Sequence, residues 1–94
     1  MAKYTVIMDW EGGTYIDQSP GNSVHQAMCR WAESLDVAPI EGMGPASKSQ
    51  LIAEIRDDDG VPLLGLSNVW CYSALIRGKS ALINVVRTDE LNPE

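Results

Sequence analysis

The stretch KYTVIMDWEGGTYIDQ, residues 3–18, decides how the chain begins to fold. Up to Trp10, every second residue is large and apolar, an alternation typical of a strand with one buried face. The run TYIDQ, residues 14–18, is rich in residues that favour strands. Gly12 and Gly13 lie between these runs, and glycine accepts the positive φ of a hairpin turn without a steric penalty. We therefore predict a β-hairpin at the start of the chain.

A phosphate-binding loop is the alternative interpretation of the two glycines. Such a loop passes its glycines to the N-terminus of a helix, where main-chain N–H groups hold the phosphate. In this chain the glycines lead into the strand-forming run TYIDQ. They therefore predict a turn and no nucleotide site.

A helix is expected after the hairpin. Pro20-Gly21 closes the second strand, Ser23 is a suitable N-cap, and Gln26 completes a capping-box pattern. The apolar residues then recur at helical spacing, which predicts one stripe facing the core. The stripe consists of Val24, Ala27, Met28, Trp31 and Leu35.

The middle of the chain predicts a loop, a shorter helix and a turn. Residues 36–45, DVAPIEGMGP, contain two prolines and two glycines, which favour a loop. A second helix is expected from about Ser47 to Ile55, because Ser47 and Gln50 repeat the capping-box spacing. The run RDDDG, residues 56–60, then predicts a turn.

The last third of the chain predicts a second hairpin. The runs NVWCYSALI (68–76) and SALINVVRT (80–88) flank Arg77-Gly78-Lys79. VPLLGL, residues 61–66, predicts a short edge strand or an extended connection, since proline is unsuited to a central strand. The predicted fold is α+β with two layers and the order β-β-α-α-(β)-β-β. An antiparallel sheet of four to five strands, made of two hairpins, carries both helices on one face.

Length and composition indicate one globular domain spanning residues 1–94. The chain has 94 residues and is 45% hydrophobic, enough to build a single core. Its N-terminus, MAKYTVIMDW, lacks the pattern of a signal peptide, and no apolar run is long enough to cross a membrane. We therefore expect a cytoplasmic protein whose two cysteines are reduced.

The charge of the chain points to the kind of partner it would take. Thirteen acidic residues against seven basic ones give a net charge of −6 and a pI of about 4.5. Such a surface repels nucleic acids and anionic membranes and favours basic proteins. We expect a basic protein partner, no direct contact with nucleic acid or membrane, and the option of a homodimer.

Each cofactor or metal motif in the sequence lacks an essential residue. RGKS, residues 77–80, has no glycine at the spacing of a P-loop and leads into a strand. DDDG, residues 57–60, lacks the alternating ligands of a calcium loop. His25, Cys29 and Cys71 provide three zinc ligands without a fourth. We therefore expect no cofactor, no metal and no enzymatic activity.

Residues 1–35 resemble the N-terminal half of antitoxins of the HicB type. The resemblance rests on YTVI (4–7), EGGTY (11–15) and SPG (19–21), and it covers about a third of the chain. The start of the helix departs from that family's pattern, and no DNA-binding tail follows. The resemblance implies a small protein inhibitor, and we assign no family on it.

Our leading functional hypothesis is a small acidic protein-binding module of the immunity, antitoxin or phage-inhibitor kind. It would act as a stoichiometric inhibitor of a basic or nucleic-acid-handling protein, with complementary charge speeding encounter and an aromatic anchor slowing release. Trp10 and Trp70 are the candidate aromatic anchors, although core filling is the expected role of each. The candidate binding residues are Asp9, Trp10, Glu11, Asp17, Glu41, Asp57, Asp58, Asp59 and Trp70.

Two other functional hypotheses remain open from the sequence. The chain would be a homo-oligomeric structural or scaffolding module if it paired through its strand edges or its apolar second hairpin. It would be a small thiol enzyme if Cys29 and His25, four residues apart on the predicted helix, formed a nucleophile and its base.

Overall fold

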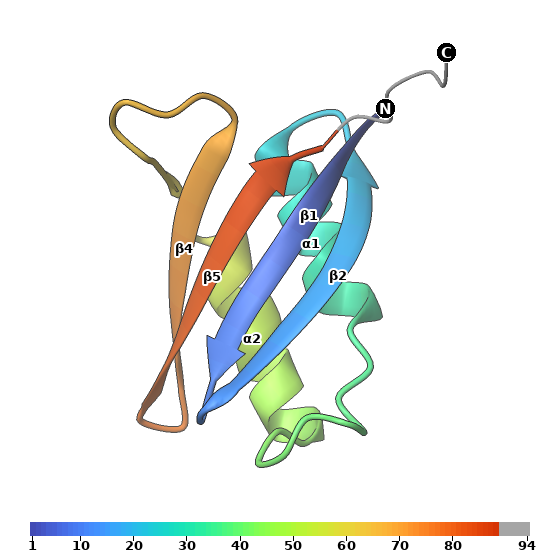
Figure 1. The fold of residues 1–94 in the computed structure, drawn as a ribbon. Helices are drawn as coiled ribbons and strands as arrows, with labels where there is room; N and C mark the ends of the chain where they lie inside the picture. Colours follow the sequence, from blue (N-terminus) through green and yellow to red (C-terminus); the bar gives the residue numbers. More distant parts are fainter. Residues whose placement is uncertain (89–94) are drawn as a thin grey trace.

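A computed structural model describes residues 1–88 and shows one antiparallel sheet with two helices (Figure 1). The strands lie in the order β2-β1-β5-β4-β3, and both helices lie on the same side of the sheet. The predicted α+β fold is therefore confirmed. Its elements are β1 (Ala2–Trp10), β2 (Gly13–Gly21), α1 (Val24–Ser34), α2 (Pro45–Arg56), β3 (Val61–Pro62), β4 (Val69–Ile76) and β5 (Lys79–Arg87).

Two tight hairpins build most of the sheet. Glu11 and Gly12 have φ of 48° and 81°, and Arg77 and Gly78 have φ of 52° and 78°. Positive φ at both central residues belongs to the two-residue turn that matches the right-handed twist of paired strands. Both predicted hairpins are present, with slightly shorter turns than expected, because the residue after each glycine already belongs to the next strand.

The first helix follows its predicted pattern, and the second begins earlier than predicted. Ser23 caps α1 by accepting a hydrogen bond from the Gln26 main chain. The predicted cap Ser47 lies inside α2 and is buried; the helix is capped at Gly44 and Pro45 occupies its first turn. Proline suits this position, because its fixed φ is helical and its missing N–H would have no partner there. The capping-box prediction for Ser47 was wrong.

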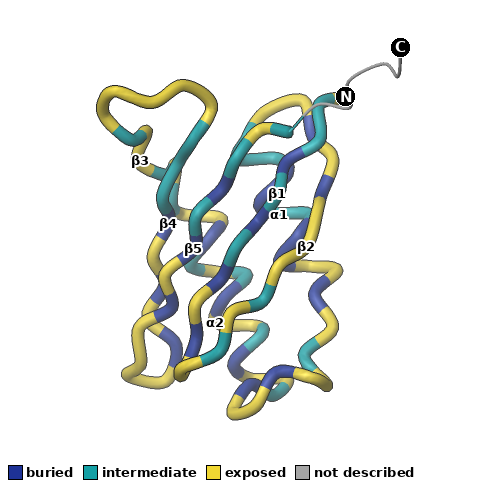
Figure 2. The backbone as a smooth tube through the Cα atoms, in the orientation of Figure 1, coloured by how far each residue is buried: buried dark blue, intermediate teal, exposed yellow. Residues whose placement is uncertain are grey.

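The core lies between the helices and one face of the sheet. The alternate β1 residues Tyr4, Val6, Met8 and Trp10 are at most 3% exposed, as the alternation predicted. Residues of β4 and β5 alternate in the same way, and Leu51 and Ile55 of α2 are fully buried. The opposite face of the sheet carries no helix or strand from residues 1–88 (Figure 2). We call it the open face.

The stretch predicted as an edge strand or a connection forms both. Val61 and Pro62 make the short strand β3 at the sheet edge, paired with Cys71 and Trp70 of β4. The following residues, 63–68, form an exposed loop. Within the described residues, 1–88, no helix is long and apolar enough to span a membrane.

Candidate functional site

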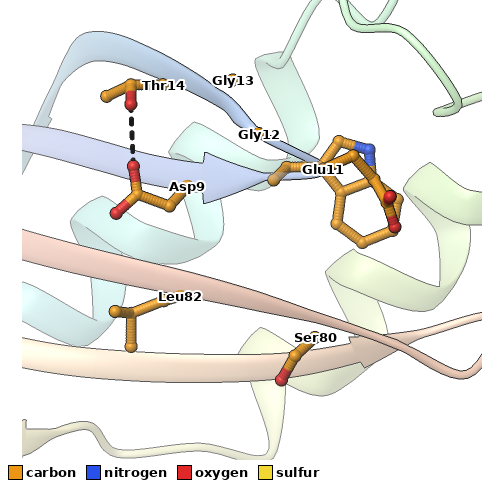
Figure 3. Close-up of a pocket in the computed structure, with 8 residues that line it drawn as sticks. Asp9, Glu11, Gly12, Gly13, Thr14, Ser80 and Leu82 are labelled. Atoms are coloured by element: carbon orange, nitrogen blue, oxygen red, sulfur yellow. Dashed lines mark hydrogen bonds between the residues drawn. The ribbon is translucent and has the colours of Figure 1, made fainter.

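The predicted acidic residues do not form one surface. Asp9 and Glu11 lie at the end of the molecule where the first hairpin turns (Figure 3), and Glu41 lines a neighbouring hollow together with Glu11. A shallow hollow of about 360 Å³ opens there, and the Asp9 carboxylate accepts a hydrogen bond of 2.9 Å from the Thr14 hydroxyl. Glu11 forms an ion pair of 3.4 Å with Lys79. Two carboxylates beside the glycine turn repel a phosphate, in agreement with the predicted turn.

The other predicted acids lie elsewhere. Asp57, Asp58 and Asp59 follow the C-terminus of α2, whereas Glu41 precedes its N-terminus. A helix of 12 residues is roughly 18 Å long, so these two groups lie at opposite ends of it. Asp17 is on strand β2, at the edge of the sheet. Any basic partner would therefore meet several separate acidic patches.

The acidic turn after α2 is fixed by buried contacts. The Tyr72 hydroxyl donates a hydrogen bond of 3.3 Å to the Asp59 carbonyl. Burial, with a smaller contribution from Asp58, raises the pKa of Tyr72 to about 12. The phenol therefore stays protonated at neutral pH and remains a donor. This hydrogen bond ties the turn after α2 to strand β4.

The three tryptophans differ in burial. Trp31 is 2% exposed and Trp10 is 3% exposed, and the Trp10 indole donates to the Glu41 carbonyl at 3.1 Å. Both fill the core, the role expected of them. Trp70 is half-buried and its ring lies 6.0 Å from that of Tyr4. Of the two candidate anchors, Trp70 alone presents surface to a partner.

His25 and Cys29 are close together, as their helical spacing predicted. The His25 Nδ1 atom lies 3.1 Å from the Asp58 carbonyl, which only accepts, so Nδ1 of the neutral ring carries its proton. Nε2 then faces the Cys29 thiol at 3.6 Å. Burial, followed by the charge of Glu33, raises the pKa of Cys29. The Nε2 atom is placed as a general base would be, whereas a nucleophilic thiol requires a lowered pKa and burial acts against that.

The Cys29 thiol should react slowly with iodoacetamide. In a Cys71→Ser variant at pH 7.5, we expect alkylation several times slower than that of free cysteine, because the thiolate is the reacting form. The rate should rise with pH through a midpoint above that of an exposed thiol. Mass spectrometry over time gives both quantities. Alkylation faster than that of free cysteine would reverse this assignment and restore the enzyme hypothesis.

Cys71 is remote from the other two candidate zinc ligands. Tyr72 and Ala74 face the helices, so Cys71 points to the open face while Cys29 lies on a helix behind the sheet. Both cysteines are free thiols. Among residues 1–88, no three histidine, cysteine or acidic side chains are grouped so as to hold a metal ion.

The open face carries four of the seven large apolar residues that are exposed within 1–88. Ile16, Leu75 and Leu82 are 67%, 55% and 45% exposed on it, and Val61, paired with Cys71, shares it. Lys3 and Asp9 are the charged residues of the strands on this face. The sequence signal for this surface is the run 69–76, because a strand that is apolar on both faces is typically covered on both sides or by a partner. The exposed large apolar residues within 1–88 are Met1, Ile16, Val61, Leu64, Leu66, Leu75 and Leu82.

The β4 edge of the sheet is closed by side chains of α2. The outward N–H of Leu75 donates to the Glu54 carboxylate at 2.9 Å, and that of Arg77 donates to Gln50 at 2.8 Å. Glu54 and Gln50 are one helical turn apart and occupy positions that an added strand would need. Pairing between copies through this edge is therefore disfavoured.

The β2 edge is closed over part of its length. The two-residue turn makes Trp10 and Gly13 a hydrogen-bonded pair, so in the same register Tyr15 and Asp17 also bond to β1 and the N–H groups of the residues between them point outward. The N–H of Gln18 is bonded to the Asp17 carboxylate at 2.8 Å, and Pro20 has no N–H. The main chain from Thr14 to Ile16 remains without such a block. This difference between the edges has no signal in the sequence, because it depends on which strands lie outermost.

Comparison with known protein families, with curated proteins and with solved structures finds no match. The function is therefore argued from the geometry of the chain itself.

Proposed function

We propose that the chain is a small protein-binding module that acts as a stoichiometric inhibitor of a basic protein. The observation that carries the proposal is the placement of exposed apolar side chains on the open face and on the adjoining loop, residues 63–68. A sheet face that is exposed to solvent carries mainly polar side chains, whereas the open face also exposes Ile16, Leu75 and Leu82. Exposed apolar patches of this kind mark surfaces that another protein covers.

Charge supports a basic partner. Residues 1–88 contain ten acidic and seven basic residues, and the remaining acids lie in residues 89–94. Asp9 and Glu11 lie at the hairpin end of the open face, and Asp17 lies on the outermost strand β2, so an approaching basic protein would be attracted before apolar contact forms. The apolar face would then supply the slow dissociation that a stoichiometric inhibitor needs.

A capture experiment tests this function. The tagged full chain is incubated with lysate of its native cells at low and high salt, and captured proteins are identified by mass spectrometry. We expect one basic protein, recovered in larger amount at low salt because surface charge attraction is screened. Its activity should be titrated to zero at equimolar ratio. The proposal would be contradicted if no basic protein were captured, or if the captured amount were the same at low and high salt.

A further inference from the structure

A groove runs along the outer edge of β2. It has a volume of about 350 Å³ and is lined by four consecutive strand residues, 14–17. Successive side chains of a strand point to opposite faces, so a hollow touching all four must lie along the edge. The inner edge is covered by β1, which leaves the outer one. The far wall comes from α1 and the loop after it, with Trp31, Leu35, Asp36, Pro39 and Ile40.

The floor and the edge of this groove offer different interactions. Its apolar lining from Trp31, Leu35 and Ile40 suits a large apolar side chain. Beside it, Thr14 and Ile16 turn their main-chain N–H and C=O groups outward. An extended peptide binds such an edge by adding a strand, with main-chain hydrogen bonds for affinity and alternate side chains for specificity.

The negative charge of the groove favours a basic peptide over a second copy of the chain. Asp17 and Asp36 lie in its lining, which holds no basic residue. A second copy paired through this edge would bring a second acidic lining and no basic residue from the same groove, which is unfavourable. A segment with lysine or arginine beside its apolar residue is attracted instead.

We propose that the Thr14–Ile16 edge and the groove bind an extended segment of the partner that carries one large apolar residue flanked by basic residues. This deepens the proposed function and rests on it: the segment would belong to the basic protein that the chain inhibits. It adds a short antiparallel strand to β2, places its apolar side chain between Trp31 and Ile40, and sets its basic residues near Asp17 and Asp36.

Proline at position 16 provides the test. Ile16→Pro removes an outward N–H that the sheet does not use, and proline is tolerated on such an edge. Ile16→Ala is the matched control, because it shortens the same side chain and keeps the N–H. Heptapeptides displayed on phage are selected on the full chain, and the enriched peptides are synthesised for calorimetry. We expect lysine or arginine next to a large apolar residue, and affinity roughly tenfold lower for Ile16→Pro than for Ile16→Ala.

A second variant keeps the inference testable if Ile16→Pro does not fold. The double variant Asp17→Asn/Asp36→Asn removes both negative charges. Each asparagine keeps a side-chain oxygen that can accept the hydrogen bond from the main-chain N–H of Gln18 or Ala38. We expect it to bind the enriched peptides several-fold more weakly at low salt. Enrichment of acidic peptides, no enrichment, or equal affinity of all variants would overturn the inference, as would a dimer in light scattering that Ile16→Pro dissociates.

The capture experiment separates the two proposals. If Ile16→Ala and Ile16→Pro capture the same basic protein equally, the edge inference fails and the proposed function stands. If neither captures a basic protein, the proposed function fails.

Discussion

Gly60→Ala should destabilise the protein by about 3 kcal/mol, through backbone strain and a clash with a buried ring. Gly60 has φ of +76°, and a Cβ atom there would lie 2.6 Å from Cε1 and Cζ of Tyr72. Tyr72 is 1% exposed, so its ring has little room to move. Urea denaturation followed by tryptophan fluorescence measures the free energy of unfolding.

Gly78→Ala is the matched control for this effect. Its φ of +78° is nearly the same, and nothing lies within 4 Å of its Cβ position. The loss should therefore reflect strain alone, about 1 kcal/mol. Equal losses at the two positions would show that Tyr72 does not pack over Gly60 as described.

Leu51→Ala should lower the free energy of unfolding by about 2–5 kcal/mol. Leu51 is fully buried on the side of α2 that faces the sheet, so its loss leaves a cavity in addition to the lost apolar burial. The same denaturation experiment measures the change.

Leu82→Ala is the control on the open face. Leu82 is 45% exposed, so truncating it should change the free energy of unfolding by less than about 1 kcal/mol. A large loss at Leu82 that grows with protein concentration would mean that a second copy covers the open face. That result would favour the homo-oligomeric hypothesis over the inhibitor.

Local patterns in the sequence were sufficient to predict most of the fold. The Tyr4-to-Trp10 alternation, the Ser23 cap and the two glycine turns depend on neighbouring residues, and the structure confirms each. The start of α2 was mispredicted because Ser47 matches a cap by spacing, whereas Pro45 defines the first turn. Proline at a helix start has as clear a mechanism as serine and was the better signal.

The candidate site was harder to predict because it depends on contacts between distant residues. Charge identified the acidic residues, but α2 separates Glu41 from Asp57 and the sheet order places Asp17 at an edge. The closed β4 edge depends on Gln50 and Glu54 reaching Leu75 and Arg77 from another element. No pattern within one segment reports such a contact.

A pair of lysine substitutions tests whether the open face binds the partner. Leu82→Lys places a charge in the open face, and Ala53→Lys adds the same charge at an exposed position on α2, behind the sheet. Calorimetry with the captured basic protein compares both variants with the wild-type chain. We predict that Leu82→Lys binds at least about tenfold more weakly and that Ala53→Lys binds nearly as well as the wild type. Equal affinity of the two variants would contradict the assignment of the open face as the binding surface.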